Sequence, residues 1–144
     1  MKEFSKVEVG TRFIAALIDA AIGWAVGFIP VIGGLIGAAY MLVKDGLFEG
    51  QSVGKKVMNL QVVNMEGVKA DFSLSAKRNV IFAIPLLLMV IPILGWVVAP
   101  FLSLIILIIE ALKVMNDPQG RRIGDNWADT QVIAFKEIGE AQDL

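Results

Sequence analysis

The 144-residue sequence contains no cysteine and no histidine. These absences exclude a disulfide bond, a thiol nucleophile, an imidazole base, a zinc–thiolate site and a histidine-ligated haem. Charge is also scarce, since Asp, Glu, Lys and Arg make up 19% of the chain and the formal net charge is −1. Because a basic excess is missing, we expect no nucleic acid as a partner. We also expect no enzymatic activity, no metal and no cofactor.

Apolar residues, in contrast, are abundant. They make up 56% of the chain, and the mean hydropathy is +0.70. A water-soluble domain of this size cannot bury so much apolar surface. The composition therefore predicts an integral membrane protein, and the length predicts a single domain over residues 1–144.

The apolar residues form two long blocks. Phe13 to Val43 contains one charge, Asp19, and Val80 to Ile109 contains none. One transmembrane helix needs about 20 residues, so each block is too long for a single upright span. Each block is interrupted near its middle by an Ile-Pro-x-x-Gly sequence, at 29–33 and 91–95, which predicts a helical hairpin. We therefore expect an all-α membrane protein with four short spans, at about 12–29, 33–48, 74–94 and 96–115.

The basic residues support four spans. All 13 Lys and Arg lie in the N-terminal, central and C-terminal segments, and none lies in the two Pro–Gly turns. With four spans these segments share one face of the membrane, as the positive-inside rule requires, whereas two spans would divide them. Both termini are then cytoplasmic. The two turns lie 62 residues apart, which is compatible either with a duplicated hairpin or with two unrelated short turns.

The cytoplasmic segments are predicted at 49–73 and 116–144. Val57 to Phe72 has the pattern of a β-hairpin, Ser73 is the expected N-cap of the third long helix, and Thr130 to Phe135 is a candidate third strand. Gly50 to Lys56 is similar to a phosphate-binding loop but has the wrong glycine spacing and a lysine where Ser or Thr binds magnesium. We therefore expect its lysines, Lys55 and Lys56, to contact lipid headgroups.

Asp19 is the most informative residue. It lies two helical turns after Arg12, close to the membrane midplane, where a carboxylate costs roughly 2.5–3.5 kcal/mol. Arg12, Ala16, Asp19, Gly23 and Gly27 share one helix face, so we expect Asp19 to face a tightly packed seam with Gly34, Gly37 or Ala38. Two functions fit: an ion or proton site, or a structural ion pair with Arg12, Arg121 or Arg122.

Three further acidic residues lie near the predicted inner interface. Glu110 lies in the fourth span, one turn before Lys113, and is expected to be structural, with Arg12 as a cross-helix partner. Asp45 and Glu49 follow the second span and are expected to be solvated.

Three sequence segments resemble the RDD family of small bacterial membrane proteins, which is named for one Arg and two Asp. They are Arg12 to Asp19, the Gly50-Gln51-Ser52-Val53-Gly54-Lys55 loop, and Asp125-Asn126-Trp127-Ala128-Asp129-Thr130-Gln131-Val132. The resemblance implies that the named residues are Arg12, Asp19 and Asp125, with Asp45 as a rival for the second Asp. It also implies a multi-pass protein of the bacterial cytoplasmic (inner) membrane.

The resemblance further implies a function, because some members have been linked to cation/proton antiport. Our leading hypothesis is exchange of Na+, Li+ or K+ for H+ at Asp19, with Arg12 tuning its protonation and Asp125 organising the cytoplasmic mouth. Four short spans barely enclose a pathway, so we expect a homo-oligomer among the membrane lipids. The alternative is a non-catalytic scaffold or accessory subunit. In that case Asp125 holds the closing segment, which begins at Asp125 and ends at Val132, against Arg12 or Arg78.

Overall fold

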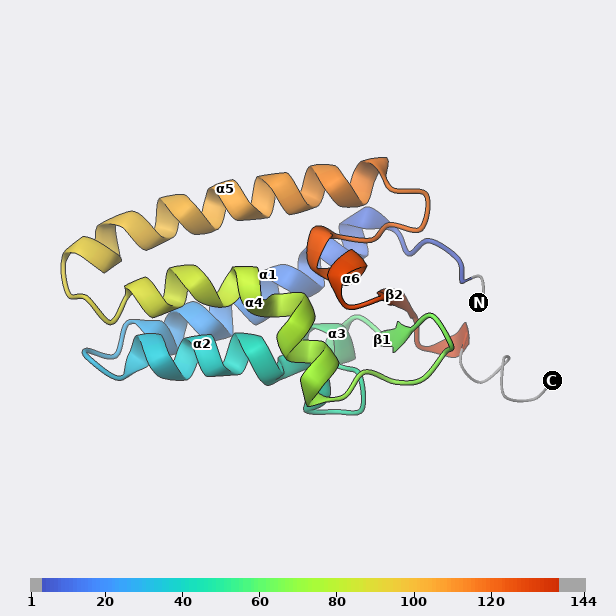
Figure 1. The fold of residues 1–144 in the computed structure, drawn as a ribbon, viewed down its shortest axis with the longest axis horizontal. Coiled ribbons are helices and arrows are strands. Elements are labelled where there is room, and N and C mark those ends of the chain that lie inside the picture. The colour runs from blue at the N-terminus through green and yellow to red at the C-terminus, as the bar shows by residue number, and fades with distance from the viewer. Residues whose placement is uncertain (1–3, 138–144) are drawn as a thin grey trace.

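The computed structural model describes residues 4–137 and is mostly helical. Two helical hairpins lie side by side, and a small cap lies at the end of the bundle opposite the two hairpin turns (Figure 1). The hairpins consist of α1 (Val9–Gly27) with α2 (Gly33–Val43), and α4 (Phe72–Leu88) with α5 (Leu94–Asn116). The cap consists of η1 (Lys44–Gly46), α3 (Val53–Val57), α6 (Ile123–Trp127), β1 (Leu60–Asn64) and β2 (Thr130–Ala134).

The two predicted hairpins are present, although their helices differ in length from the predicted spans. α1 and α5, with 19 and 23 residues, are long and apolar enough to cross a membrane. α2 has 11 residues and ends at Val43 rather than residue 48, because the chain tightens into η1 and turns into the cap. α4 has 17 residues and ends at Leu88 rather than residue 94, because Met89 to Ile93 form the turn.

The two turns have the same backbone conformation. The residue after each proline, Val31 or Ile93, has a positive φ of 70° or 67°. In each turn the glycine N–H donates to the isoleucine carbonyl four residues earlier, at 2.9 Å. The repeat noticed in the sequence is therefore also a repeat in geometry.

The cap repeats as well, with an offset of 70 residues. α3 and β1 correspond to α6 and β2, and the two strands pair antiparallel with Val62 opposite Val132. Cross-strand hydrogen bonds occur as an equivalent pair, Met65 N–H to the Asp129 carbonyl and Phe135 N–H to the Asn59 carbonyl. Each half of the chain is thus a helical hairpin followed by a short helix and a strand.

The predicted β-hairpin over Val57 to Phe72 is present as a short pairing, in which the Asn64 N–H donates to the Val68 carbonyl, the Ala70 N–H donates to the Val62 carbonyl, and Val63 and Lys69 form a bridge. Along its whole length β1 pairs with β2, the candidate third strand. Both strands are buried at their first four residues, so the sheet belongs to the core of the cap. The N-cap of α4 is Asp71, which accepts from the Leu74 N–H, rather than Ser73.

Glycine permits the close approach of the two helices in the first hairpin. The buried face of α1 contains Arg12, Ala15, Asp19, Gly23 and Gly27, which confirms the predicted seam with Ala15 in place of Ala16. A Cβ at Gly37 would lie 2.7 Å from the Gly23 carbonyl oxygen, so α2 packs backbone to backbone on α1. Gly34 faces the backbone of α4 instead.

Candidate functional site

A cluster of charged side chains, all buried except the partly buried Arg122, lies where the cap meets the bundle. Its residues, which we call the buried charge cluster, come from α1, η1, α3, α4 and the start of α6. They are Arg12, Asp19, Lys44, Asp45, Lys55, Arg78, Arg122 and Asp125.

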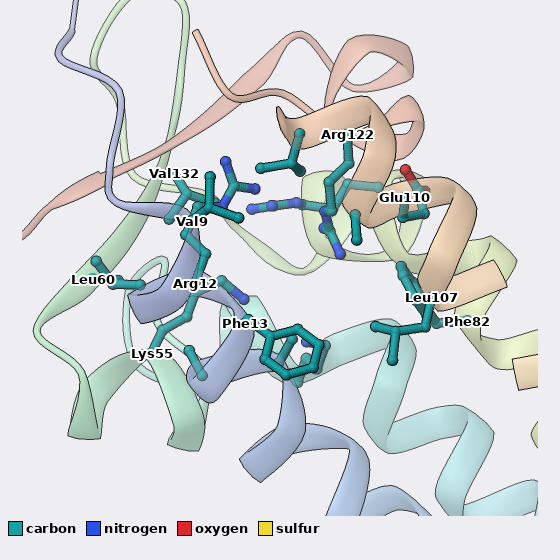
Figure 2. A pocket seen from close by; sticks show the side chains of 16 residues that line it. Val9, Arg12, Phe13, Lys55, Leu60, Phe82, Leu107, Glu110, Arg122 and Val132 are labelled. Atoms are coloured by element: carbon teal, nitrogen blue, oxygen red, sulfur yellow. The ribbon is translucent and has the colours of Figure 1, made fainter. Parts of the chain in front are cut away.

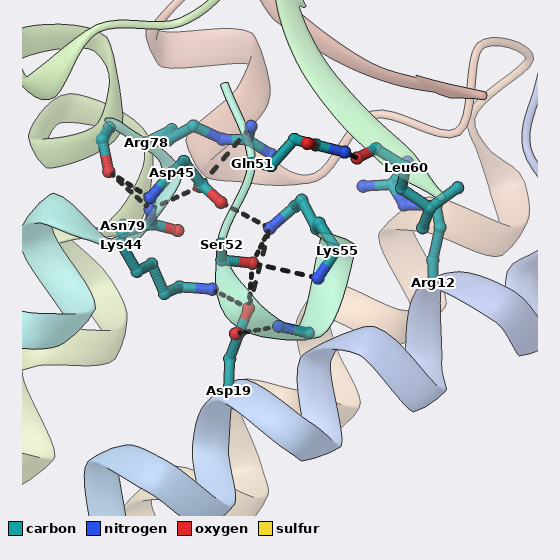
Figure 3. Close-up of polar contacts among 12 residues, drawn as sticks. Arg12, Asp19, Lys44, Asp45, Gln51, Ser52, Lys55, Leu60, Arg78 and Asn79 are labelled. Carbon is teal, nitrogen blue, oxygen red and sulfur yellow. Dashed lines mark hydrogen bonds and ion pairs between the residues drawn. The ribbon is translucent and has the colours of Figure 1, made fainter. Parts of the chain in front are cut away.

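Asp19 is fully buried, as predicted, and both of its carboxylate oxygens accept several hydrogen bonds. Oδ1 accepts from the Gly54 N–H at 2.9 Å and from the Tyr40 hydroxyl at 3.2 Å. Oδ2 accepts from the Ser52 hydroxyl at 2.6 Å and from Lys44 Nζ at 2.9 Å (Figure 3). Lys55 Nζ lies 3.9 Å from Asp19 Oδ2. The predicted partners Arg12, Arg121 and Arg122 are wrong, because the loop after α2 folds back over Asp19 and brings in these donors.

Local sequence explains this fold-back. Ser52 is the N-cap of α3 and accepts from the Lys55 N–H, so one hydroxyl both begins the helix and donates to Asp19. A Cβ at Gly54 would collide with the Ala15 carbonyl oxygen, so only glycine lets α3 lie this close to α1. The loop that resembles a phosphate-binding motif therefore binds a carboxylate of its own chain.

Asp45 is also fully buried, and its predicted solvation is wrong. Oδ1 accepts from Lys55 Nζ at 2.6 Å and Oδ2 accepts from the Asn79 amide at 2.8 Å. Arg78 Nη1 lies 3.6 Å from Oδ2. Lys55 is 7% exposed, so it does not meet lipid headgroups at the protein surface as predicted.

Asp125 binds three arginines. Arg78 Nη2 lies 2.6 Å from Oδ1, Arg122 Nη2 lies 3.1 Å from Oδ1, and Arg12 Nη2 lies 3.1 Å from Oδ2. Arg12 also donates to the Gly120 carbonyl. The prediction that Asp125 holds the closing segment against Arg12 or Arg78 matches this geometry, with both arginines bound.

Arg78 and Asn79 connect the part of the cluster around Asp19 and Asp45 with the part around Asp125. Arg78 lies between Asp45 and Asp125, while Asn79 donates to Asp45 and accepts from Arg122 at 3.3 Å. Both come from the middle of α4 and are fully buried. A continuous path of ion pairs therefore runs from Asp19 through Lys55, Asp45 and Arg78 to Asp125.

The sequence model of the RDD family matches residues 31–129 of this chain. The chain belongs to the RDD family. No curated protein and no solved structure matches it. The matched residues include Asp45 and Asp125, while Arg12 and Asp19 precede them. In this RDD protein three aspartates, Asp19, Asp45 and Asp125, are buried in the cluster.

Burial and the neighbouring charges shift the pKa values of several groups in the cap of the RDD protein, among them Asp125 and Lys55. Burial alone would raise the pKa of the Asp125 carboxyl, but the guanidinium groups of Arg122, Arg78 and Arg12 outweigh it and hold that pKa well below its usual range. Burial lowers the pKa of the Lys55 ammonium to about 7, although the Asp45 carboxylate opposes this change. Asp125 is thus a fixed anion, and Lys55 titrates near neutral pH.

The remaining predicted residues of the RDD protein have smaller roles. Glu110 is 3% exposed and accepts from the Ile123 N–H at 2.8 Å rather than from Arg12. The Arg121 side chain packs near Met65, and its backbone N–H donates to Asp117 Oδ1 at 3.0 Å. Lys56 is exposed and stacks over the Phe48 ring. Glu49 is exposed, as predicted, and pairs with Lys69.

Sequence reasoning missed the roles of Lys44, Ser52 and Asn79. Ser52 carried a signal in its N-cap position, whereas Lys44 looked like an ordinary interfacial lysine. Within residues 4–137, no group of three His, Cys, Asp or Glu side chains is arranged to hold a metal ion.

Two adjoining cavities lie beside the cluster, between α1, α4 and α5. The first, of about 70 Å³, is lined by all five cations of the cluster and by Glu110. Figure 2 shows Arg12 and Glu110 on opposite sides of it. The second, of about 370 Å³, is mostly apolar and extends along the helices past Ala20 and Trp24.

Proposed function

We propose that this RDD protein is a non-catalytic membrane module, a scaffold or accessory subunit of the bacterial inner membrane. Its four helices span the membrane, and its buried Arg and Asp residues hold the cytoplasmic cap on the bundle. One observation carries this proposal: the oxygens of Asp19 and Asp125 are occupied by the chain's own hydrogen-bond donors.

The four-span part of the proposal rests on the outer faces of α2 and α4, the two shorter helices. Leu35 and Ile36 on α2 are 53% and 47% exposed, and Ile84 and Leu87 on α4 are 47% and 46% exposed. A monomer in water does not keep such a continuous apolar belt. Lipid would cover it, and the short helices suit a span that ends where the chain enters the cap.

The orientation follows from charge. Neither hairpin turn contains Lys or Arg, whereas the cap and the segments beside it contain all 12 of those within residues 4–137. The positive-inside rule then puts the cap and both termini in the cytoplasm. Because the chain has no cysteine, this topology can be tested with single cysteines at Val31, Ile93, Lys56 and Glu66. In intact spheroplasts an impermeant maleimide should label the first two positions and leave the last two unlabelled.

The contacts of Asp19 favour the structural function over exchange at Asp19. A monovalent cation needs several free oxygen ligands, but two ammonium groups, two hydroxyls and a backbone amide already surround this carboxylate. Removing one partner from such a buried pair leaves an uncompensated charge. Asp19 therefore stabilises the junction between α1, η1 and α3.

Cation/proton exchange stays a second candidate because of one observation at Lys55. Its Nζ is surrounded by oxygens, with Asp45 Oδ1 at 2.6 Å, Ser52 Oγ at 3.4 Å and Asp19 Oδ2 at 3.9 Å. If Lys55 releases its proton, Na+, Li+ or K+ would compete for these oxygens. In that mechanism Lys55 carries the exchanged proton and Asp19 with Asp45 bind the cation.

One experiment separates the two functions. Proteoliposomes with an imposed pH gradient receive Na+, Li+ or K+, and dissipation is compared among the wild type, Asp19→Asn, Lys55→Met and the exposed control Lys56→Met. The structural function predicts no cation-dependent dissipation in any sample and reduced stability in the first two variants. Dissipation that is present in the wild type and Lys56→Met, but lost in correctly folded Lys55→Met, would establish exchange instead.

The proposal includes a homo-oligomer, because the exposed apolar faces of these short helices provide surface for helix association in the bilayer. Native mass spectrometry from nanodiscs tests it. Monomers over the whole range of protein-to-lipid ratios would contradict this part alone.

A further inference from the structure

We propose that the two adjoining cavities bind one anionic phospholipid, with its phosphate in the charged cavity and an acyl chain in the apolar one. This inference rests on the membrane location proposed above and assigns a ligand to the inner end of the bundle.

The lining of the first cavity selects an anion. Five cations and one carboxylate, Glu110, line it, because Asp19, Asp45 and Asp125 lie behind the cations they pair with. The formal charge of the cluster is +2, from five cations and three carboxylates, and Glu110 reduces the sum to +1. One Glu110 oxygen is already bound to the Ile123 N–H. An entering anion therefore finds an excess of positive charge.

Arg78 provides donors that need an acceptor. It lines the cavity, it is fully buried, and its Nε and Nη1 have no hydrogen-bond partner. A buried, unsatisfied donor on a charged group costs more than the roughly 1–3 kcal/mol of a neutral one. Guanidinium groups bind phosphate oxygens through paired N–H donors. A volume of about 70 Å³ holds several water molecules and accommodates a group of phosphate size.

The second cavity identifies the ligand as an amphiphile rather than a free anion. Ala16, Lys44, Phe82, Leu107 and Arg122 line both cavities, so the two adjoin directly. Beyond Lys44 and Arg122 its lining is almost wholly apolar, including Trp24, Met41 and Leu104. Small residues on α1, Ala16 and Ala20, leave the space that separates α1 from α5. Together the two cavities are polar at the cap and apolar along the helices, which matches the headgroup and the acyl chain of a phospholipid in the inner leaflet.

The test uses the full-length protein in detergent, with thermal unfolding and native mass spectrometry as readouts. The probes are phosphatidylglycerol, phosphatidylcholine, diacylglycerol and inorganic phosphate. We expect phosphatidylglycerol to raise the melting temperature and remain bound in the gas phase, and the other three to have little effect. Equal effects of phosphatidylcholine and phosphatidylglycerol, or of inorganic phosphate alone, would overturn the proposal.

Paired variants test each half of the site. Arg122→Gln removes a cation that lines both cavities but leaves Asp125 with Arg78 and Arg12, and Arg121→Gln is its neighbour outside the lining. Ala20→Phe fills the apolar cavity, and Ala21→Phe puts the same ring on the exposed face of α1. We expect Arg122→Gln and Ala20→Phe to weaken phosphatidylglycerol binding about tenfold or more and the controls to retain it.

Wild-type affinity in both Arg122→Gln and Ala20→Phe, when their lipid-free melting temperatures show them to be folded, would overturn the site. A protein that carbonate extracts from membranes would refute the membrane location itself, whereas an inserted protein without lipid selectivity would refute only this inference.

Discussion

Arg78 Nη2 lies 2.6 Å from Asp125 Oδ1, and both side chains are fully buried. The two residues are 47 positions apart and join the middle of α4 to the short helix α6. Gly124, next to Asp125, permits this contact, because a Cβ there would collide with the Arg78 carbonyl oxygen. This ion pair and the absence of a side chain at Gly124 therefore let α6 pack directly against α4.

Asp125→Asn should be among the most destabilising single changes in the cap. It leaves Arg12, Arg78 and Arg122 buried around a neutral amide, and loss of one partner from a buried pair costs about 3–5 kcal/mol. Unfolding by denaturant in detergent measures the change. Asp129→Asn is the control, since Asp129 is exposed and asparagine tolerates its positive φ of 49°. Equal stability of the two variants would refute the structural function of Asp125.

Asp19 and Lys44 should show coupled stabilities. Asp19→Asn leaves Lys44 buried without its carboxylate, and Lys44→Met alone leaves Asp19 with fewer cations. The double variant should therefore be more stable than the sum of the single changes, by about 0.5–3 kcal/mol. Combining Asp19→Asn with Lys113→Met, which affects a separate pair with Asp117, should give additive losses. Additivity in both combinations would show that Asp19 and Lys44 do not interact.

The architecture could be predicted from the sequence where a local signal decided it. The Pro–Gly turns at 29–33 and 91–95 predicted the two helical hairpins, and the small residues along α1 predicted its buried face. The pairing of β1 with β2 could not be predicted in this way, because it joins strands 70 residues apart and local turn residues at Asn64 to Gly67 favoured a hairpin.

The partners of the predicted site residues were hardest to predict. Helix spacing indicated that Asp19 is buried but gave no information on the loop that folds over it. Asp45 was expected to be solvated and Lys55 to contact lipid headgroups, because each lies outside an apolar block, yet the cap buries both. Equivalent positions in the two repeats have opposite charges, Lys55 and Asp125, and they pair with Asp45 of η1 and Arg78 of α4, respectively. That relationship becomes visible only when α3 and α6 are compared in space.

Gly54→Ala should weaken the cap far more than an ordinary helix substitution. The added Cβ would meet the Ala15 backbone and lie 3.0 Å from Asp19 Oδ1, so α3 must move and the Gly54 N–H leaves Asp19. Gly10→Ala is the matched control, because its Cβ would meet only the Glu8 side chain at 3.6 Å. Alanine at position 10 should be neutral or should stabilise α1 by about 0.5–1 kcal/mol. Hydrogen exchange at residues 53–57 would reveal whether α3 has separated; unchanged protection in Gly54→Ala would contradict the close packing.

Lys55 should make stability depend on pH above neutrality. Its pKa is lowered from 10.5 to about 7 in the folded protein, chiefly by burial. Between these values the unfolded chain holds a proton that the folded protein has released, so the free energy of unfolding rises with pH, by at most about 1.4 kcal/mol per pH unit. Lys55→Met removes this contribution. The free energy of unfolding of the wild type, minus that of the variant, should therefore increase from pH 7 to pH 10. Lys56→Met, which removes an exposed ammonium, should keep the wild-type profile. Parallel profiles for wild type and Lys55→Met would show that Lys55 stays protonated beside Asp45 and would remove the main support for a proton-exchange function at this residue.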